Sequence, residues 1–309
     1  MRSHTIPITI YFIIALASLA PGAHSQIIKI DTVTHWKKAF KAGINLNQAS
    51  FSSNWKAGGV NSLGFTAYLN YKANYKKDKH SWDNEIDLSY GLVNNQGQGY
   101  RKTLDRVFLD TKFGKALNKN WDLSASANLQ TQFAGGYTYT KDAAGVEQPK
   151  LISDLLAPAY ITAALGFEYH PVDYFKLRLS PFSPRVTIVR DIGSYYDAVT
   201  NPTPFGVKPG ESTRFQWAAF QLLAEFNKDI APNLNLKWRY ILYADYETFD
   251  VNKIDHRLDL NITAKVNKFI NVSLGGIAMY FYNQDKDVQI SQALSLGVFY
   301  TFQNFEEKK

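Results

Sequence analysis

Apolar and polar residues alternate along most of this chain, in runs of about ten residues separated by turn-forming segments. A period of two places successive side chains on opposite faces of a β-strand. The clearest run, residues 122–133, has Leu123, Leu129 and Phe133 among its alternate apolar positions. About twelve such runs follow one another, and their connections are alternately short and long. This pattern predicts an all-β fold, an antiparallel up-and-down transmembrane β-barrel of about twelve strands.

The first residues have the form of a secretory signal peptide. Arg2 and His4 precede an apolar stretch at residues 6–20, and small residues follow as far as Ser25. The apolar stretch is shorter than the ~20 residues that a membrane-spanning helix needs, so we expect cleavage after Ser25. The expected organisation is a signal peptide at 1–25, a periplasmic segment at 26–38, the barrel at 39–302 and a tail at 303–309.

The composition agrees with a barrel in a membrane. The chain has 19 Tyr, 20 Phe and 6 Trp, yet its mean hydropathy is −0.26. Aromatic girdles around a barrel with a polar lumen account for both observations. The absence of Cys excludes thiolate metal sites and cysteine nucleophiles. The net charge of +7 is spread over strands and turns, and no nucleic-acid motif is present, so we expect neither nucleic-acid binding nor a cofactor.

The strand phase directs charges of both signs toward the predicted lumen. It places Lys72 opposite Glu85 and Glu168 opposite Lys176, at the spacing of about 5 Å that permits cross-strand ion pairs. It also brings Glu225 close to a lysine on the following strand. The lumen-facing candidates are Lys72, Asp83, Glu85, Asp87, Asp110, Lys112, Glu168, Lys176, Arg178, Glu225, Lys237, Arg239, Asp245, Arg257 and Asp259.

These charges have two interpretations. In the first, the cations of residues 176–178 and 237–239 form a wall that faces the acids of residues 83–87, and this constriction selects small polar or charged solutes. In the second, polar side chains fill the lumen, and the barrel is a structural or accessory part of an envelope complex. Its partners would then bind the long loops at residues 134–159 and 181–210.

Several short motifs resemble a barrel family of Bacteroidota that is known only as a domain of unknown function. The resemblance extends over roughly residues 36–302 and implies a location in the envelope, with no activity or catalytic residue to carry over. The motifs are Phe51-Ser52-Ser53-Asn54-Trp55 with Gly58-Gly59, Asn70-Tyr71, Tyr75-Lys76-Lys77, Trp82-Asp83-Asn84, Tyr90-Gly91, Arg101-Lys102-Thr103 with Asp105, Thr131-Gln132-Phe133, Leu156-Ala157-Pro158-Ala159-Tyr160 and Ser180-Pro181.

The first of these motifs lies in the connection between the first two predicted strands. Asn54, Gly58 and Gly59 permit tight turns, and Trp55 can anchor a loop at a low entropic cost. This loop either folds over the pore or meets a partner, or it is a structured turn whose Trp lies at the lipid interface.

Catalysis and metal binding are not expected. His256 is the only histidine with lipid-facing phase, and its predicted neighbours Ala244, Tyr246 and Tyr280 include no serine for a Ser–His pair. The acids of residues 83–87 lie ~7 Å apart along one strand, too far to share one ion. We therefore expect a non-enzymatic protein of the outer membrane that contacts lipid, with small polar solutes or envelope proteins as its partners.

Overall fold

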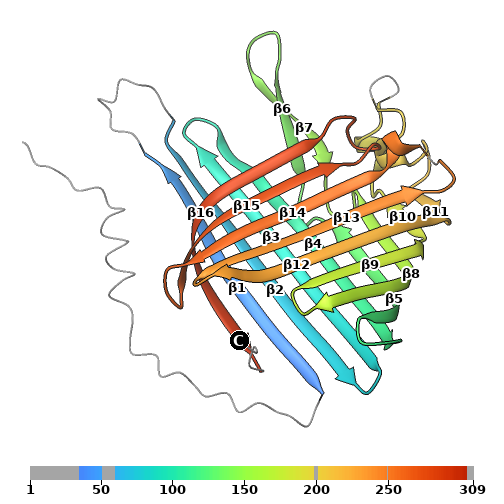
Figure 1. Cartoon of the computed structure of the whole chain (residues 1–309). Helices are drawn as coiled ribbons and strands as arrows, with labels where there is room; N and C mark the ends of the chain where they lie inside the picture. The colour runs from blue at the N-terminus through green and yellow to red at the C-terminus, as the bar shows by residue number, and fades with distance from the viewer. Residues whose placement is uncertain (1–34, 51–59, 198–200, 249, 305–309) are drawn as a thin grey trace, which may run out of the picture.

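Twelve antiparallel strands close into a ring in this computed structural model, which describes residues 35–50, 60–197, 201–248 and 250–304 (Figure 1). Each strand pairs with its neighbour, and the ring closes through the pairing of β1 with β16 and of β8 with β9. The ring strands are β1 (Trp36–Ala49), β2 (Ser62–Lys77), β3 (His80–Asn95), β4 (Gly99–Ala116), β5 (Trp121–Thr131), β8 (Ala159–Val172), β9 (Phe175–Phe182), β12 (Ala219–Ala231), β13 (Leu234–Asp245), β14 (Asp255–Lys265), β15 (Ile270–Tyr280) and β16 (Gln289–Gln303).

The remaining elements belong to the long connections. Strands β10 (Arg185–Ile188) and β11 (Thr213–Gln216) pair with each other, and β10 also pairs with β8. They therefore extend the wall of the barrel on the loop side of β9 and β12. Strands β6 (Gly136–Lys141) and β7 (Glu147–Ser153) form a separate hairpin that stands above the barrel in Figure 1. The 3₁₀ helices are η1 (Ile192–Ser194), η2 (Pro204–Gly206) and η3 (Val251–Lys253).

Among the described residues, no helix is both long and apolar enough to cross a membrane.

The alternation of residues along β5 shows how the sequence builds the wall. Leu123 points outward and is 46 % exposed, whereas the next residue, Ser124, points inward and is 3 % exposed. Ala125 and Ser126 repeat the pattern one step along the strand. An apolar outer face around a polar interior is the arrangement of a barrel of the outer-membrane type. The predicted all-β antiparallel transmembrane barrel of about twelve strands is therefore confirmed.

Aromatic side chains form a belt at the end of the barrel where the connections are short. The ring centroids of Trp121 and Tyr169 lie 4.8 Å apart, and those of Phe226 and Trp238 lie 5.8 Å apart in stacked planes. Trp36 contacts two further rings of the belt. Such belts lie at the boundary between hydrocarbon and water.

The long connections at the opposite end pack on one another. Ala157, Val189 and Val207 are fully buried, and they form a small apolar core with Tyr195. This core joins the connection that carries β6 and β7 to the connection between β10 and β11. We call these four residues the loop core. It fixes two long loops beside the mouth of the barrel.

The structure corrects one predicted loop and adjusts several boundaries. The segment at residues 93–105 is rich in Gly and Asn, which predicts a loop, but it contains only a tight turn. Strand β3 runs to Asn95 and β4 begins at Gly99, and the left-handed conformations of Gly97 (φ 84°) and Gly99 permit the reversal. The wall also extends slightly beyond residues 39–302, since β1 begins at Trp36 and β16 ends at Gln303. The signal peptide and the motif of Asn54, Trp55, Gly58 and Gly59 lie outside the described residues.

Candidate functional site: the charged lumen

The lumen-facing candidates lie on β2, β3, β4, β8, β9, β12, β13 and β14, and most of them form ion pairs inside the barrel. Near the short turns, Lys112 is the centre of one cluster. Its ammonium lies 2.5 Å from Glu168 and 2.9 Å from Asp83, and its side chain is only 2 % exposed. Lys176 approaches Asp83 to 3.9 Å, and Arg178 lies 3.3 Å from Asp110. The cluster neutralises buried charges from four different strands.

Arg239 is the centre of a second cluster, halfway up the lumen. Its guanidinium pairs with Glu225 on the neighbouring strand and with Glu85 on β3. Lys72 lies 3.6 Å from Glu85, and Lys237 lies 4.0 Å from it. Strands β3 and β13 are diametrically opposed in the ring, because β2, β1, β16, β15 and β14 separate them on one side and β4, β5, β8, β9 and β12 on the other. The pair Arg239–Glu85 therefore crosses the lumen.

A second pair crosses the lumen next to the first. Arg106 on β4 lies 3.1 Å from Asp259 on β14, and these two strands are also opposite members of the ring. Phe108, which is 1 % exposed, packs with its ring between the two guanidiniums, 5.1 Å from that of Arg106 and 4.7 Å from that of Arg239. We call Arg239–Glu85 and Arg106–Asp259 the crossbars.

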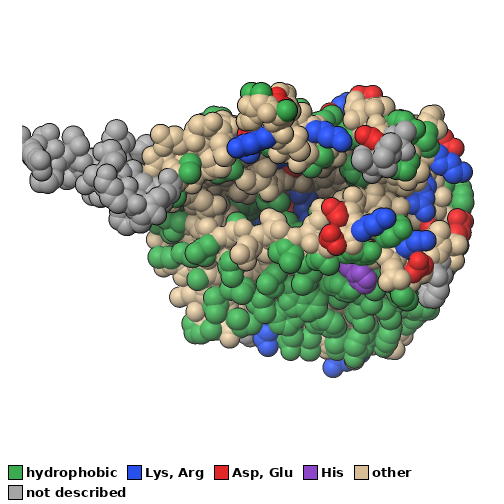
Figure 2. Space-filling model, turned by 90° about the horizontal axis from the view of Figure 1, so that it is seen from above, with side chains coloured by type: hydrophobic (Ala, Val, Ile, Leu, Met, Phe, Trp, Pro, Cys, Tyr) green, Lys and Arg blue, Asp and Glu red, His purple; other side chains and the backbone are tan. Residues whose placement is uncertain are grey.

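Water reaches the lumen on the short-turn side of the crossbars. The side chains of Lys72, Lys176 and Lys237 are 35 to 38 % exposed, whereas that of Arg239 is 5 % exposed. The other end is open as well: seen from the loop side, the molecule is hollowed at its centre, and basic side chains lie inside the hollow (Figure 2). Two wet chambers are thus separated by a layer of paired charges.

The predicted register holds for one ion pair and fails for another. Lys72 lies opposite Glu85 as expected. Glu168, however, lies opposite Arg178 rather than Lys176, because β8 runs to Val172 and the turn before β9 comes only at residues 173–174. Glu225 lies directly opposite Arg239, and Lys237 is two residues away on the same face of β13. The cations of residues 176–178 and 237–239 are in direct contact with the acids of residues 83–87.

Three of the remaining candidates lie at or above the crossbars. Asp245 pairs with Arg214 at 3.3 Å near the upper rim, and Arg257 pairs with Asp259 at 2.9 Å. Asp87 lies on β3 two residues after Glu85, on the same face of the strand. It is partly buried.

The sequence reasoning missed several residues of the lumen. Arg106 and Phe108 have the same phase as the candidates at 110 and 112, so the period-two pattern of β4 contained a signal for them. Arg185 lies on β10, within the predicted loop at residues 181–210, and Arg214 lies on β11, just after this loop. The alternation there is too short to mark a strand.

His256, the histidine considered for catalysis, contacts aromatic and apolar side chains. The ring of His256 lies against Tyr240, whose hydroxyl is 2.7 Å from Nδ1, and His256 faces Leu242 and Tyr280 on the adjacent strands. Within the described ranges, no group of three His, Cys, Asp or Glu side chains has the geometry of a metal site.

The model of a family described as "Protein of unknown function (DUF3078)" matches residues 46–137, which supports the resemblance to an uncharacterised family. A Bacteroidota origin stays a prediction. No curated protein matches the sequence.

The solved structures to which this chain is similar share little of its sequence. The COG4313 outer membrane channel from Pseudomonas putida F1 is 11 % identical, with 92 % of this chain and 99 % of that chain covered and a TM-score of 0.39. The translocator domain of the autotransporter NalP from Neisseria meningitidis is 9 % identical, with 86 % and 87 % covered and a TM-score of 0.38. The NanC porin is 7 % identical, with 84 % and 98 % covered and a TM-score of 0.37.

Proposed function

We propose that this protein is an outer-membrane barrel that passes small polar or charged solutes through its charged lumen, and that the crossbars keep the lumen closed in the conformation described here. One observation carries the proposal: the layer that separates the two wet chambers consists of ionic side-chain tips. Such groups can exchange one charged partner for another, which is how rings of charged side chains in channels bind and release a passing ion.

The outer-membrane location is part of the same proposal. It is supported by the apolar outer face and by the aromatic belt at the end with short turns. We expect the secreted chain to begin at Gln26, the long loops to face the outside and the short turns to face the periplasm. Protease added to intact cells should cut the β6–β7 hairpin and spare the short turns. Cleavage at the short turns instead would mean that the barrel has the opposite orientation in the membrane.

Single-channel conductance of the refolded protein in a planar bilayer tests the passage of solutes. The informative variant is Glu85→Gln/Arg239→Gln, which removes one crossbar without changing the net charge. We expect larger conductance steps than in the wild type. The matched control is Asp250→Asn/Lys253→Gln, which removes an exposed pair of 3.7 Å in the loop between β13 and β14 and should leave the conductance unchanged.

A second candidate function, an accessory barrel with a filled lumen, is favoured by the deep burial of Lys112 and Arg239. In that case neither the folded wild type nor the folded Glu85→Gln/Arg239→Gln variant would show conductance in the bilayer. Deletion of the hairpin at residues 136–153 would instead release a bound envelope protein. That combination of results would overturn the passage of solutes.

A further inference from the structure

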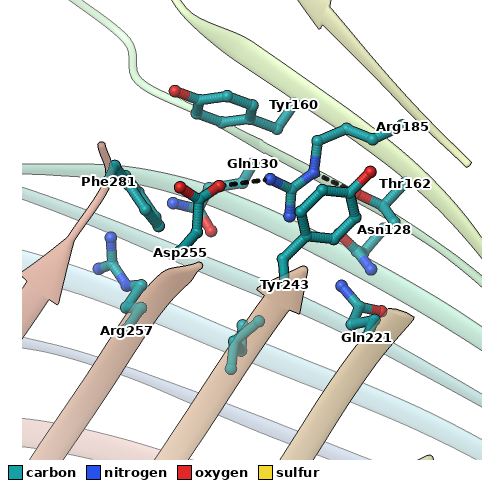
Figure 3. Close-up of a pocket in the computed structure, with 11 residues that line it drawn as sticks. Asn128, Gln130, Tyr160, Thr162, Arg185, Gln221, Tyr243, Asp255, Arg257 and Phe281 are labelled. Carbon is teal, nitrogen blue, oxygen red and sulfur yellow. Dashed lines mark hydrogen bonds and ion pairs between the residues drawn. The ribbon is translucent and has the colours of Figure 1, made fainter. Parts of the chain in front are cut away.

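A small polar cavity lies in the upper lumen, on the loop side of the crossbars (Figure 3). Side chains from β5, β8, β10, β12, β13 and β14 line it, so opposite parts of the wall converge on one point. Its volume is ≈ 20 Å³, which is room for about one water-sized group.

Two buried side chains in this cavity have polar atoms without a partner among the described residues. The amide oxygen of Gln221 and the hydroxyl of Tyr243 form no hydrogen bond, although each side chain belongs to a residue that is 2 % exposed. The two residues lie directly opposite each other on β12 and β13, and Figure 3 shows both side chains extending from their strands into the cavity. Buried polar atoms are costly when unpaired, so such a pair indicates a site for a hydrogen-bonding ligand.

The charges around the cavity are already neutralised. Arg185 lies 2.9 Å from Asp255 and donates a hydrogen bond to Thr162, and its guanidinium packs 3.2 Å from the ring centroid of Tyr243. Arg257, at the edge of the cavity, pairs with an acid outside it. An anionic ligand would therefore have to displace an existing partner, whereas a neutral ligand would not.

The other lining groups are amides and aromatic rings. The side-chain amides of Asn128 and Gln130 face the same cavity and can donate as well as accept hydrogen bonds. The rings of Tyr160 and Phe281 lie beside them with centroids 5.9 Å apart. Aromatic surface with a few convergent hydrogen-bonding groups is the usual composition of a site for a small polar molecule.

We propose that this cavity binds a hydroxyl group of a neutral, hydroxyl-rich solute of the saccharide class, with the rest of the solute in the hollow seen from the loop side in Figure 2. The hydroxyl accepts a hydrogen bond from one of the lining groups and donates one to the Gln221 oxygen. This inference deepens the proposed function, because it names a class of solute that would enter the lumen.

Calorimetric titration of the refolded full-length mature protein tests the site, in a detergent without a sugar headgroup. The probes are glucose as the neutral polyol and sodium acetate as the anion. We expect saturable binding of glucose and none of acetate. The variant Tyr243→Phe removes only the unpartnered hydroxyl and should weaken glucose binding about threefold to tenfold. The variant Tyr68→Phe, which removes an inward hydroxyl on β2, is the control and should bind glucose as the wild type does.

Folding measurements separate a ligand site from a structural role. Because the Tyr243 hydroxyl has no partner among the residues that the structure describes, Tyr243→Phe should keep the wild-type unfolding midpoint. Three results would overturn the inference: no saturable glucose binding, equal glucose affinity of Tyr243→Phe and wild type, or a lowered midpoint of Tyr243→Phe without glucose binding, which indicates an ordered water only. Glucose binding without conductance would overturn the passage of solutes and retain the proposed site. Conductance without glucose binding would overturn the proposed site and retain the passage of solutes.

Discussion

Arg239 and Glu85 form an ion pair although five strands separate them in each direction around the barrel. A contact between opposite walls links the fold to its proposed function, because the same side chains stabilise the interior and close the path through it. The strength of this contact can be measured apart from conductance.

We predict that Arg239→Ala destabilises the barrel by about 3–5 kcal/mol, because it leaves the buried Glu85 and the partly buried Glu225 without their main cation. The reference variant is Arg239→Met combined with Glu85→Gln and Glu225→Gln, which removes all three charges and should cost clearly less. Urea unfolding of the protein in lipid vesicles measures both. Equal losses in the two variants would mean that packing, and not the unpaired acids, causes the effect.

A positive charge on the outer face tests the assignment of faces. Leu165 is 52 % exposed on β8, at a position that faces lipid. The variant Leu165→Lys should lose roughly 2–4 kcal/mol if this position lies near the bilayer midplane. The lumen-facing variant Asn74→Lys, opposite Asp83, should change the unfolding free energy by about 0.5 kcal/mol or less. A normal stability of Leu165→Lys in lipid would contradict the strand phase.

The loop core should unfold independently of the wall. Val207 is fully buried in it, so Val207→Ala should cost the local structure about 2 kcal/mol. We expect faster protease cleavage within residues 183–218, with no change in the resistance of the folded barrel to heating in detergent. The exposed Val251→Ala is the control. Unchanged cleavage of Val207→Ala would show that the loops are held by other contacts.

The tip of the β6–β7 hairpin should respond to acid. Asp142 accepts hydrogen bonds from the Gln148 side chain and from the backbone amides of Val146 and Ala144, which lower the pKa of its carboxyl group below 3.8. Because the folded pKa is depressed, the stabilisation is present above the unfolded pKa and is lost as the pH falls through the folded one. NMR should show the amide signals of Ala144 and Val146 titrating with a midpoint below 3.8, and Asp142→Asn should abolish this transition. A midpoint at or above 3.8 would contradict these bonds.

The sequence allowed the wall to be predicted but not the contents of the lumen. Period-two alternation identified the faces, and the short turn between β2 and β3 fixed the register of Lys72 and Glu85. The turn between β8 and β9 lies at residues 173–174, and the alternation does not mark its position, so the predicted partner of Glu168 was wrong. The crossbars join strands that lie far apart in sequence. Their existence depends on how the ring closes, which no local pattern encodes.

The candidate site shows the same limit. Arg106 had the correct phase, yet nothing in β4 indicates a partner on β14. The cavity depends on Arg185, which follows a break in the strand after Phe182 and lies within a stretch rich in proline. Local rules interpret such a stretch as a loop.

The crossbars also have a mechanical consequence. A β-barrel is held together around its circumference by hydrogen bonds between strands, and these bonds do little to prevent the tube from being squashed into an ellipse. Arg239–Glu85 and Arg106–Asp259 act along two neighbouring diameters, so flattening in either direction stretches or compresses an ion pair. The ion pairs inside the barrel then resist the lateral pressure of the surrounding bilayer together with the wall. We expect a change in membrane thickness or tension to alter the distances within these pairs first.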